Sequence, residues 1–116
     1  MLIKLATYNI HGCVGLDRKK DPERIGRVLL EMNADIIALQ EVEHAHTVDE
    51  LGIINDDHPY NIVLGPTVSS RSSHYGNVLL SRFPVVAERK INLSYPGREK
   101  RGAIDVEIDC RGRVIR

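Results

Sequence analysis

The sequence predicts a single α/β domain built on a mixed sheet with flanking helices. Strand, helix and strand patterns follow one another within the first 41 residues, and the second half alternates at period two. The 116 residues suffice for one core but not for two comfortable ones. No stretch approaches the ~20 apolar residues that a membrane span requires.

The first expected strand covers residues 2–9, where Leu, Ile, Thr and Tyr alternate with other residues. A glycine-containing loop follows over residues 11–17. Asp21 and Pro22 are typical of a helix N-cap and first helical position, so we expect a helix to begin there. Asn33 tolerates the left-handed conformation and is the expected end. The buried face of the helix would hold Ile25, Val28, Leu29 and Met32.

Residues 34–39 have a continuous apolar centre, which predicts a strand buried on both faces. A strand–helix–strand crossover makes its two strands parallel. Asn9 and the pair Gln40 and Glu41 should therefore emerge together at the carboxyl ends of the strands. Open α/β sheets hold their functional sites at such ends.

Thr47 to Glu50 has the Thr-x-x-Glu form of a capping box and predicts a short helix supported by Leu51 and Ile54. Four strands are then expected over residues 60–64, 77–81, 85–92 and 103–109. Phe83 and Pro84 should turn a hairpin. Loops are expected over residues 68–74 and 93–100, and a turn over 109–113 precedes the start of a return strand.

Sixteen basic residues balance sixteen acidic ones, so no overall field would attract nucleic acid or an anionic membrane. Any phosphate recognition must be local. Cys13 and Cys110 lie far apart in the sequence and neither has a C-x-x-C partner. We therefore expect reduced thiols and no disulfide framework. The first residues lack the pattern of a secretion signal, so a cytoplasmic location is expected.

Glu41 is the first candidate for chemistry because it ends a wholly apolar strand. A carboxylate there must be solvated or held by a partner or a cation. Mg²⁺ suits it, since this ion often uses one or two carboxylates and completes its shell with water and substrate phosphate. The Asn9 amide could bind the metal, orient Glu41 or bond a phosphoryl oxygen. From spacing alone, two polar residues that merely end their strands remain the alternative.

Two other interpretations are weaker. Glu43, His44 and His46, with His58 and His74 elsewhere, suggest zinc, but no further pair at a recognisable spacing completes a tetrahedral site, so a solvated loop is favoured. An unrelated nucleotide-binding α/β domain ranks last, because neither G-x-G-x-x-G nor G-x-x-x-x-G-K-[ST] is present.

Four segments occur in an order typical of one family: Ala6 to Gly12, Asp35 to Val42, Tyr75 to Val85, and Lys100 to Ala103. Together they resemble the N-terminal half of the endonuclease/exonuclease/phosphatase family. The resemblance implies half of a four-layer α/β sandwich and a phosphoesterase that depends on Mg²⁺ or Mn²⁺. Its substrates would be phosphate esters of nucleic acids, small molecules or lipid headgroups.

By this resemblance, Glu41 corresponds to the metal-binding glutamate and Asn9 to the asparagine beside it, both catalytic. Arg101 would fork onto phosphate oxygens, or else be a solvated member of a basic cluster. Asn77 would line the cleft, or simply begin a strand. His11 would approach substrate, or be a loop histidine with a local partner.

The family's later motifs, Gly-Asp-x-Asn and Ser-Asp-His, do not occur in this sequence. We therefore assign no general base and expect residues 1–116 to form a partial domain. A sheet face left without its partner sheet would favour self-association. The alternative function is a noncatalytic half-domain that serves as a binding or assembly module.

Overall fold

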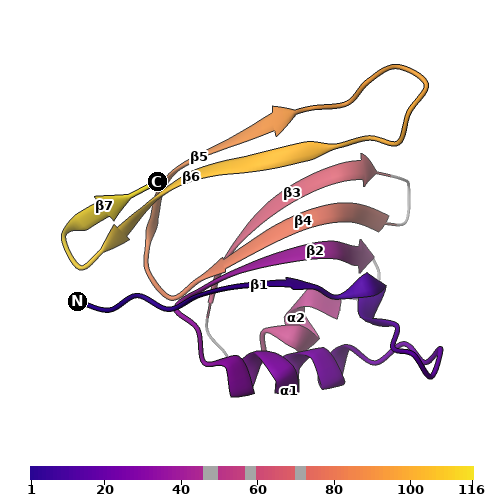
Figure 1. The fold of residues 1–116 in the computed structure, drawn as a ribbon, viewed down its shortest axis with the longest axis horizontal. Coiled ribbons are helices and arrows are strands. Elements are labelled where there is room, and N and C mark those ends of the chain that lie inside the picture. The colour runs from indigo at the N-terminus through magenta and orange to yellow at the C-terminus, as the bar shows by residue number, and fades with distance from the viewer. Residues whose placement is uncertain (46–49, 57–59, 70–72) are drawn as a thin grey trace.

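The computed structural model describes residues 1–45, 50–56, 60–69 and 73–116. A four-stranded sheet in the order β1-β2-β4-β3 has helices against one face and a three-stranded sheet, β5-β6-β7, across the other (Figure 1). β1 and β2 are parallel, whereas the other pairs are antiparallel. The predicted α/β class with a mixed sheet is confirmed.

The predicted strand–helix–strand unit is present. β1 (Leu5–Asn9) pairs with β2 (Ile36–Ala45), and Asn9 lies opposite Gln40. A single 3₁₀ turn, η1 (His11–Cys13), follows β1. Helix α1 (Pro22–Met32) then leads back to the sheet and ends at Asn33, whose φ of 48° is left-handed as expected. The crossover therefore brings the carboxyl end of β1 beside Gln40 in the middle of β2, which continues to Ala45.

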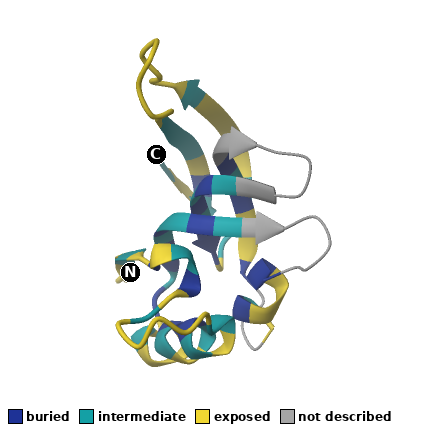
Figure 2. Ribbon diagram, turned by 90° about the vertical axis from the view of Figure 1, so that its right-hand side faces the viewer, coloured by how far each residue is buried: buried dark blue, intermediate teal, exposed yellow. Residues whose placement is uncertain are grey.

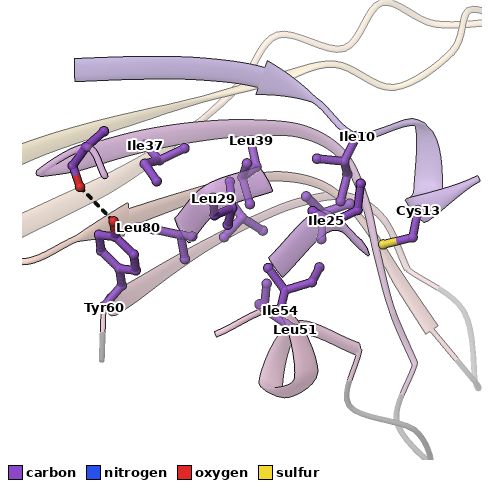
Figure 3. Packing of buried hydrophobic residues seen from close by; sticks show 13 residues of the cluster. Ile10, Cys13, Ile25, Leu29, Ile37, Leu39, Leu51, Ile54, Tyr60 and Leu80 are labelled. Atoms are coloured by element: carbon purple, nitrogen blue, oxygen red, sulfur yellow. Dashed lines mark hydrogen bonds between the residues drawn. The ribbon is translucent and has the colours of Figure 1, made fainter. Parts of the chain in front are cut away.

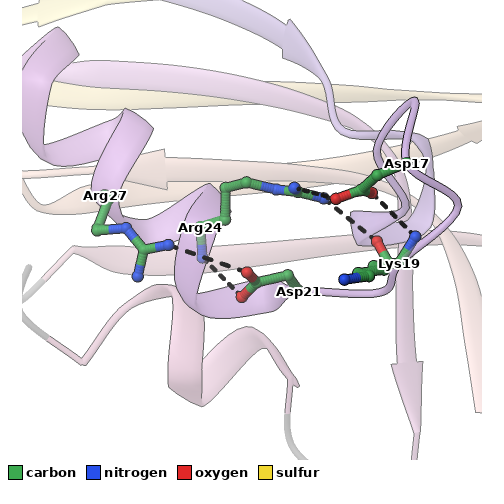
Figure 4. A network of polar contacts seen from close by, with 5 residues as sticks. All are labelled: Asp17, Lys19, Asp21, Arg24 and Arg27. Atoms are coloured by element: carbon green, nitrogen blue, oxygen red, sulfur yellow. Dashed lines mark hydrogen bonds and ion pairs between the residues drawn. The ribbon is translucent and has the colours of Figure 1, made fainter.

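The loop between β1 and α1 is fixed by polar contacts (Figure 4). Asp21 caps the helix, with its Oδ1 accepting from the Arg24 backbone N–H at 3.0 Å. The Arg24 guanidinium donates to Asp17 Oδ2 at 2.9 Å and to the Lys19 carbonyl at 3.2 Å. Arg27 lies 3.9 Å from Asp21. The segment that connects the end of β1 to α1 is thus tied to the first turns of the helix.

The antiparallel half of the first sheet contains β3 (Asn61–Ser69) and β4 (Ser73–Ser81), with the short helix α2 (Glu50–Ile54) before them. Residues 47–49 of the predicted capping box lie outside the described residues. Both strands reach into the predicted 68–74 loop, where Ser69 pairs with His74. The loop was predicted too long because a backbone ladder can continue through polar residues.

The predicted hairpin at Phe83 and Pro84 is wrong. β4 already has β2 on one side and β3 on the other, so it has no free edge for the next strand. The chain instead passes to the second sheet, where β5 (Val85–Asn92) pairs with β6 (Gly102–Cys110). Residues 93–100 form the predicted loop, and β7 (Arg113–Ile115) is the predicted return strand.

The main core lies between the helices and the first sheet (Figure 3). Leu29 of α1 and Ile37 and Leu39 of β2 are fully buried there, and the Tyr60 hydroxyl donates to the Ala34 carbonyl at 2.6 Å. No helix in the described part of the chain is long and apolar enough to cross a membrane.

A smaller cluster of Ile36, Ile108 and Cys110 joins the two sheets. Cys13 and Cys110 are both buried and free. Burial is the main cause that raises the pKa of the Cys13 thiol to about 11. The loop between β5 and β6 is exposed along its length (Figure 2).

Candidate active site

A β-bulge in β2 determines where Glu41 points. Between Leu39 and Val42 the pairing with β4 shifts, so that Gln40 and Glu41 together oppose Asn77. Leu39 and Val42 both lie in the helix-side core. Strict alternation would send residue 41 to that side as well. The extra residue gives the core position to Val42, and Glu41, at a left-handed φ of 54°, directs its carboxylate to Tyr75 and His11 instead.

Three neighbours hold the Glu41 carboxylate. The Tyr75 hydroxyl donates to Oε1 at 3.1 Å, and His11 Nδ1 lies 3.3 Å from Oε2. The Asn9 side chain donates a further hydrogen bond, which is the largest cause of a Glu41 pKa below its usual range, followed by the bond from Tyr75. The positive charge of Arg101 acts in the same direction. Glu41 is therefore an ionised carboxylate at neutral pH.

The turn after β1 orients Asn9. Its Oδ1 accepts from the His11 backbone N–H at 3.0 Å, so the amide nitrogen is the group directed at Glu41. His11 adopts a left-handed φ of 50° in the same turn. Because β1 is parallel to β2, this turn ends directly beside Glu41. The structure thus brings Asn9 to Glu41, as predicted, and adds His11 beside them. The prediction that Glu41 ends its strand is wrong, because β2 continues through the bulge to Ala45.

Asn9 and Glu41, but not His11, line a pocket of about 410 Å³ between the two sheets. Its lining residues come from the end of β1, the bulge of β2, the first half of β4 and the β5–β6 loop with the first residue of β6: Asn9, Gln40, Glu41, Tyr75, Gly76, Asn77, Glu99, Lys100, Arg101 and Gly102. The pocket therefore joins one carboxylate of the first sheet to cations of the second.

Arg101 and Asn77 both line this pocket but differ in their contacts. Arg101 is exposed and pairs with Glu99 through Nη2 and Oε2 at 3.1 Å. Asn77 is half-buried and donates from Nδ2 to the Gly102 carbonyl at 3.1 Å. The Asn77 contact ties β4 to the residue after Arg101. Asn77 thereby fixes the backbone that presents the guanidinium.

Of the side chains gathered here, the Glu41 carboxylate is the group that suits a hard divalent cation. Glu41 supplies an ionised carboxylate, and Mg²⁺ commonly takes one or two protein carboxylates beside water and phosphate. The Asn9 oxygen is turned towards His11, which favours orientation of Glu41 over metal ligation. No group of three or more His, Cys, Asp or Glu side chains able to hold a metal occurs within the described residues.

The zinc interpretation falls largely outside the described residues. His44 and His74 are cross-strand partners of β2 and β4. His46 and His58 lie in the undescribed segments, and the side chains of His44 and His74 are likewise not described. That interpretation stays a prediction without a structural test.

Tyr75 is the site residue that sequence reasoning missed. It lies two residues before Asn77 on β4, and both side chains reach the same pocket. The period-two rule would have placed Tyr75 on that face if the strand had been extended back from residue 77. The expected strand began only at residue 77, whereas β4 begins at Ser73.

Residues 6–112 match the Endonuclease/Exonuclease/phosphatase family. The chain belongs to this family. The match spans Asn9, Glu41, Asn77 and Arg101, so the family resemblance seen in the sequence is confirmed.

YbhP of Escherichia coli, an uncharacterized protein, is 31% identical over 113 residues, which cover 87% of this chain and 45% of YbhP. The chain thus spans about half the length of the curated relatives it matches. An endonuclease/exonuclease/phosphatase from Beutenbergia cavernae is similar in structure, with a TM-score of 0.77 and 25% identity over 95% of this chain and 35% of its own.

A mannosyl-6-phosphatase from Bacteroides thetaiotaomicron has a TM-score of 0.72 at 16% identity, covering 97% of this chain and 49% of its own. At that identity the likeness shows the fold alone. Family members are nucleases and phosphatases.

Proposed function

We propose that residues 1–116 form part of the catalytic domain of a divalent-metal-dependent phosphoesterase and supply the Glu41 side of its active site. The observation that carries this proposal is the bulge that turns an ionised, triply held carboxylate out of the core and into a pocket with Arg101. The family is generally metal-dependent and acts on phosphate esters or nucleic acids, which supports it.

Glu41 would hold Mg²⁺ or Mn²⁺. When bound, such a cation supplies an activated water and neutralises charge on the phosphoryl oxygens. Asn9 and Tyr75 keep the Glu41 carboxylate ionised and fixed. Little conformational entropy is therefore lost when the side chain binds a cation. His11 lies 3.3 Å from the same carboxylate and would contact a substrate oxygen.

Arg101 binds the phosphate. Its guanidinium presents N–H groups in a fork that matches two phosphoryl oxygens. The pair with Glu99 does not prevent this, because both side chains are about two-thirds exposed and such pairs contribute little. Asn77 acts through the Gly102 carbonyl as a positioning residue for Arg101. We assign no general base to any residue of this chain.

The alternative is a noncatalytic module that binds metal or assembles with another chain. One observation favours it: Leu5 on β1 and Val114 on β7 are 66% and 56% exposed, which leaves apolar surface on strands of both sheets. Self-association through such surface is the partner interaction this alternative requires.

Hydrolysis of bis(4-nitrophenyl) phosphate with Mg²⁺ or Mn²⁺ by the complete catalytic domain, of which residues 1–116 would be one part, distinguishes the two functions. We expect metal-dependent release of nitrophenol that Glu41→Gln abolishes, since the amide keeps the shape but loses the charge. Glu31→Gln, an exposed substitution on α1, is the matched control and should keep the wild-type rate. Metal binding without hydrolysis by the wild type would support the noncatalytic module.

A further inference from the structure

A second, smaller pocket of about 270 Å³ adjoins the Glu41 pocket. Its lining comes from the end of β5 and the start of β6: Lys90, Ile91, Asn92, Ser94, Lys100, Arg101 and Gly102. Lys100, Arg101 and Gly102 also line the Glu41 pocket, so the two share a wall. A ligand that bridges them passes over Arg101.

The second pocket is basic. Three of its lining residues are cations, Lys90, Lys100 and Arg101, and no carboxylate is among the described residues that line it. Two acids lie near: Glu88, 3.8 Å from Lys90, and Glu99, which pairs with Arg101. Both pairs are formed by exposed side chains and contribute little. Since the whole chain is neutral, this positive charge is a local feature.

The hairpin end that carries these cations is held in place. Leu93 N donates to the Arg101 carbonyl at 3.0 Å, and Arg101 N donates to Ser94 Oγ at 3.1 Å. Ser94 N in turn donates to Asn92 Oδ1 at 2.9 Å. The Ser94 hydroxyl and the Asn92 side-chain oxygen are thus bonded within the hairpin. The ammonium groups of Lys90 and Lys100 and the Arg101 guanidinium are charged donors that can meet a ligand there.

Given the proposed phosphoesterase function, we infer that this pocket binds a second phosphate group of the substrate, next to the phosphate at Glu41. An anion in the pocket would face two lysines and Arg101, which are standard partners for phosphate oxygens. The substrate is then a molecule with two phosphates separated by a short link.

Two kinds of substrate share this chemistry: a short nucleic-acid strand and a small bisphosphate. Tyr95, 74% exposed, lies on the same β5–β6 loop, which extends past the carboxyl end of β3 (Figure 1). Aromatic side chains beside a basic groove stack on the bases of single strands. A nucleic-acid strand would therefore stack a base on Tyr95, whereas a small bisphosphate has no base to stack there.

Calorimetric titration in Mg²⁺ at fixed ionic strength tests the inference with three probes: methyl phosphate, 5′-phosphorylated thymidine dinucleotide and glucose 1,6-bisphosphate. We expect the wild type to prefer the two-phosphate probes. Lys90→Gln should lower that preference by about tenfold, the loss of one hydrogen bond to a charged group. Lys90→Arg should restore it. Lys19→Gln, an exposed lysine before α1, is the control and should leave the preference unchanged.

An unchanged preference in Lys90→Gln would overturn the second phosphate site. Glu41→Gln tests the proposed function separately: retention of Mg²⁺-dependent methyl phosphate binding in that variant would refute it, whatever Lys90→Gln does. Tyr95→Ala identifies which of the two kinds of substrate the pocket binds. Weaker binding of the dinucleotide alone indicates a nucleic-acid strand, and unchanged binding of both probes indicates a small bisphosphate.

Discussion

Gly65→Ala tests how the two sheets meet above the candidate site. A Cβ at Gly65 would lie 2.5 Å from Cγ1 and 2.7 Å from Cδ1 of Ile104, a residue of β6. Gly65 does not have a positive φ, so alanine meets no backbone strain there. The cost of the substitution therefore depends on how closely β3 of the first sheet packs against β6 of the second.

Rearrangement to relieve such contacts costs about 1–3 kcal/mol, the usual penalty for an added methyl in a packed core. With a urea m-value of about 2 kcal/mol/M, the unfolding midpoint should fall by roughly 1 M. In the Ile104→Ala background the new methyl has room, so Gly65→Ala should cost close to zero. Urea unfolding of the four proteins in this double-mutant cycle gives a coupling of about 1–3 kcal/mol.

Equal costs in both backgrounds would refute the reasoning. The sheets would then not approach each other at Gly65, and the pocket walls contributed by Asn77 and Arg101 would not face one another as described.

Three further predictions follow from single contacts. Tyr60→Phe should lower the free energy of unfolding by about 1–3 kcal/mol in urea titration, because a buried carbonyl loses its donor. Asn9→Ala should raise the pKa of Glu41 towards its usual value in a carboxyl NMR titration, since Asn9 donates the largest stabilising hydrogen bond. Asp105, whose pKa is lowered from 3.8 to about 2 chiefly by Arg116, should stabilise the fold fully above pH 3.8. That contribution should be lost as the pH falls towards 2, so thermal unfolding of Asp105→Asn should show a weaker pH dependence across this window.

Features with local sequence signals were predictable. The N-cap at Asp21, the proline after it and the left-handed Asn33 mark both ends of α1, and the structure has all three in those roles. The parallel pairing of β1 and β2 followed from one crossover rule, and that rule was enough to bring Asn9 to Glu41.

Features that depend on strand order were not predictable. Phe83 and Pro84 look like a hairpin turn until β2 and β3 are known to occupy both edges of β4. The bulge at Glu41 has no local signal either, because glutamate is not a residue type that marks a left-handed φ. Tyr75 was missed because the expected strand began at residue 77, whereas β4 begins at Ser73.

Mg²⁺-dependent thermal unfolding, followed by far-UV circular dichroism, is the most direct test that Glu41 binds a cation. An ion that binds only the folded state raises its stability by about 2.7 kcal/mol at 100 times Kd. We predict that saturating Mg²⁺ raises the Tm of the wild type and of Glu31→Gln but leaves that of Glu41→Gln unchanged. An equal rise in Glu41→Gln, or no rise in the wild type, would contradict the account.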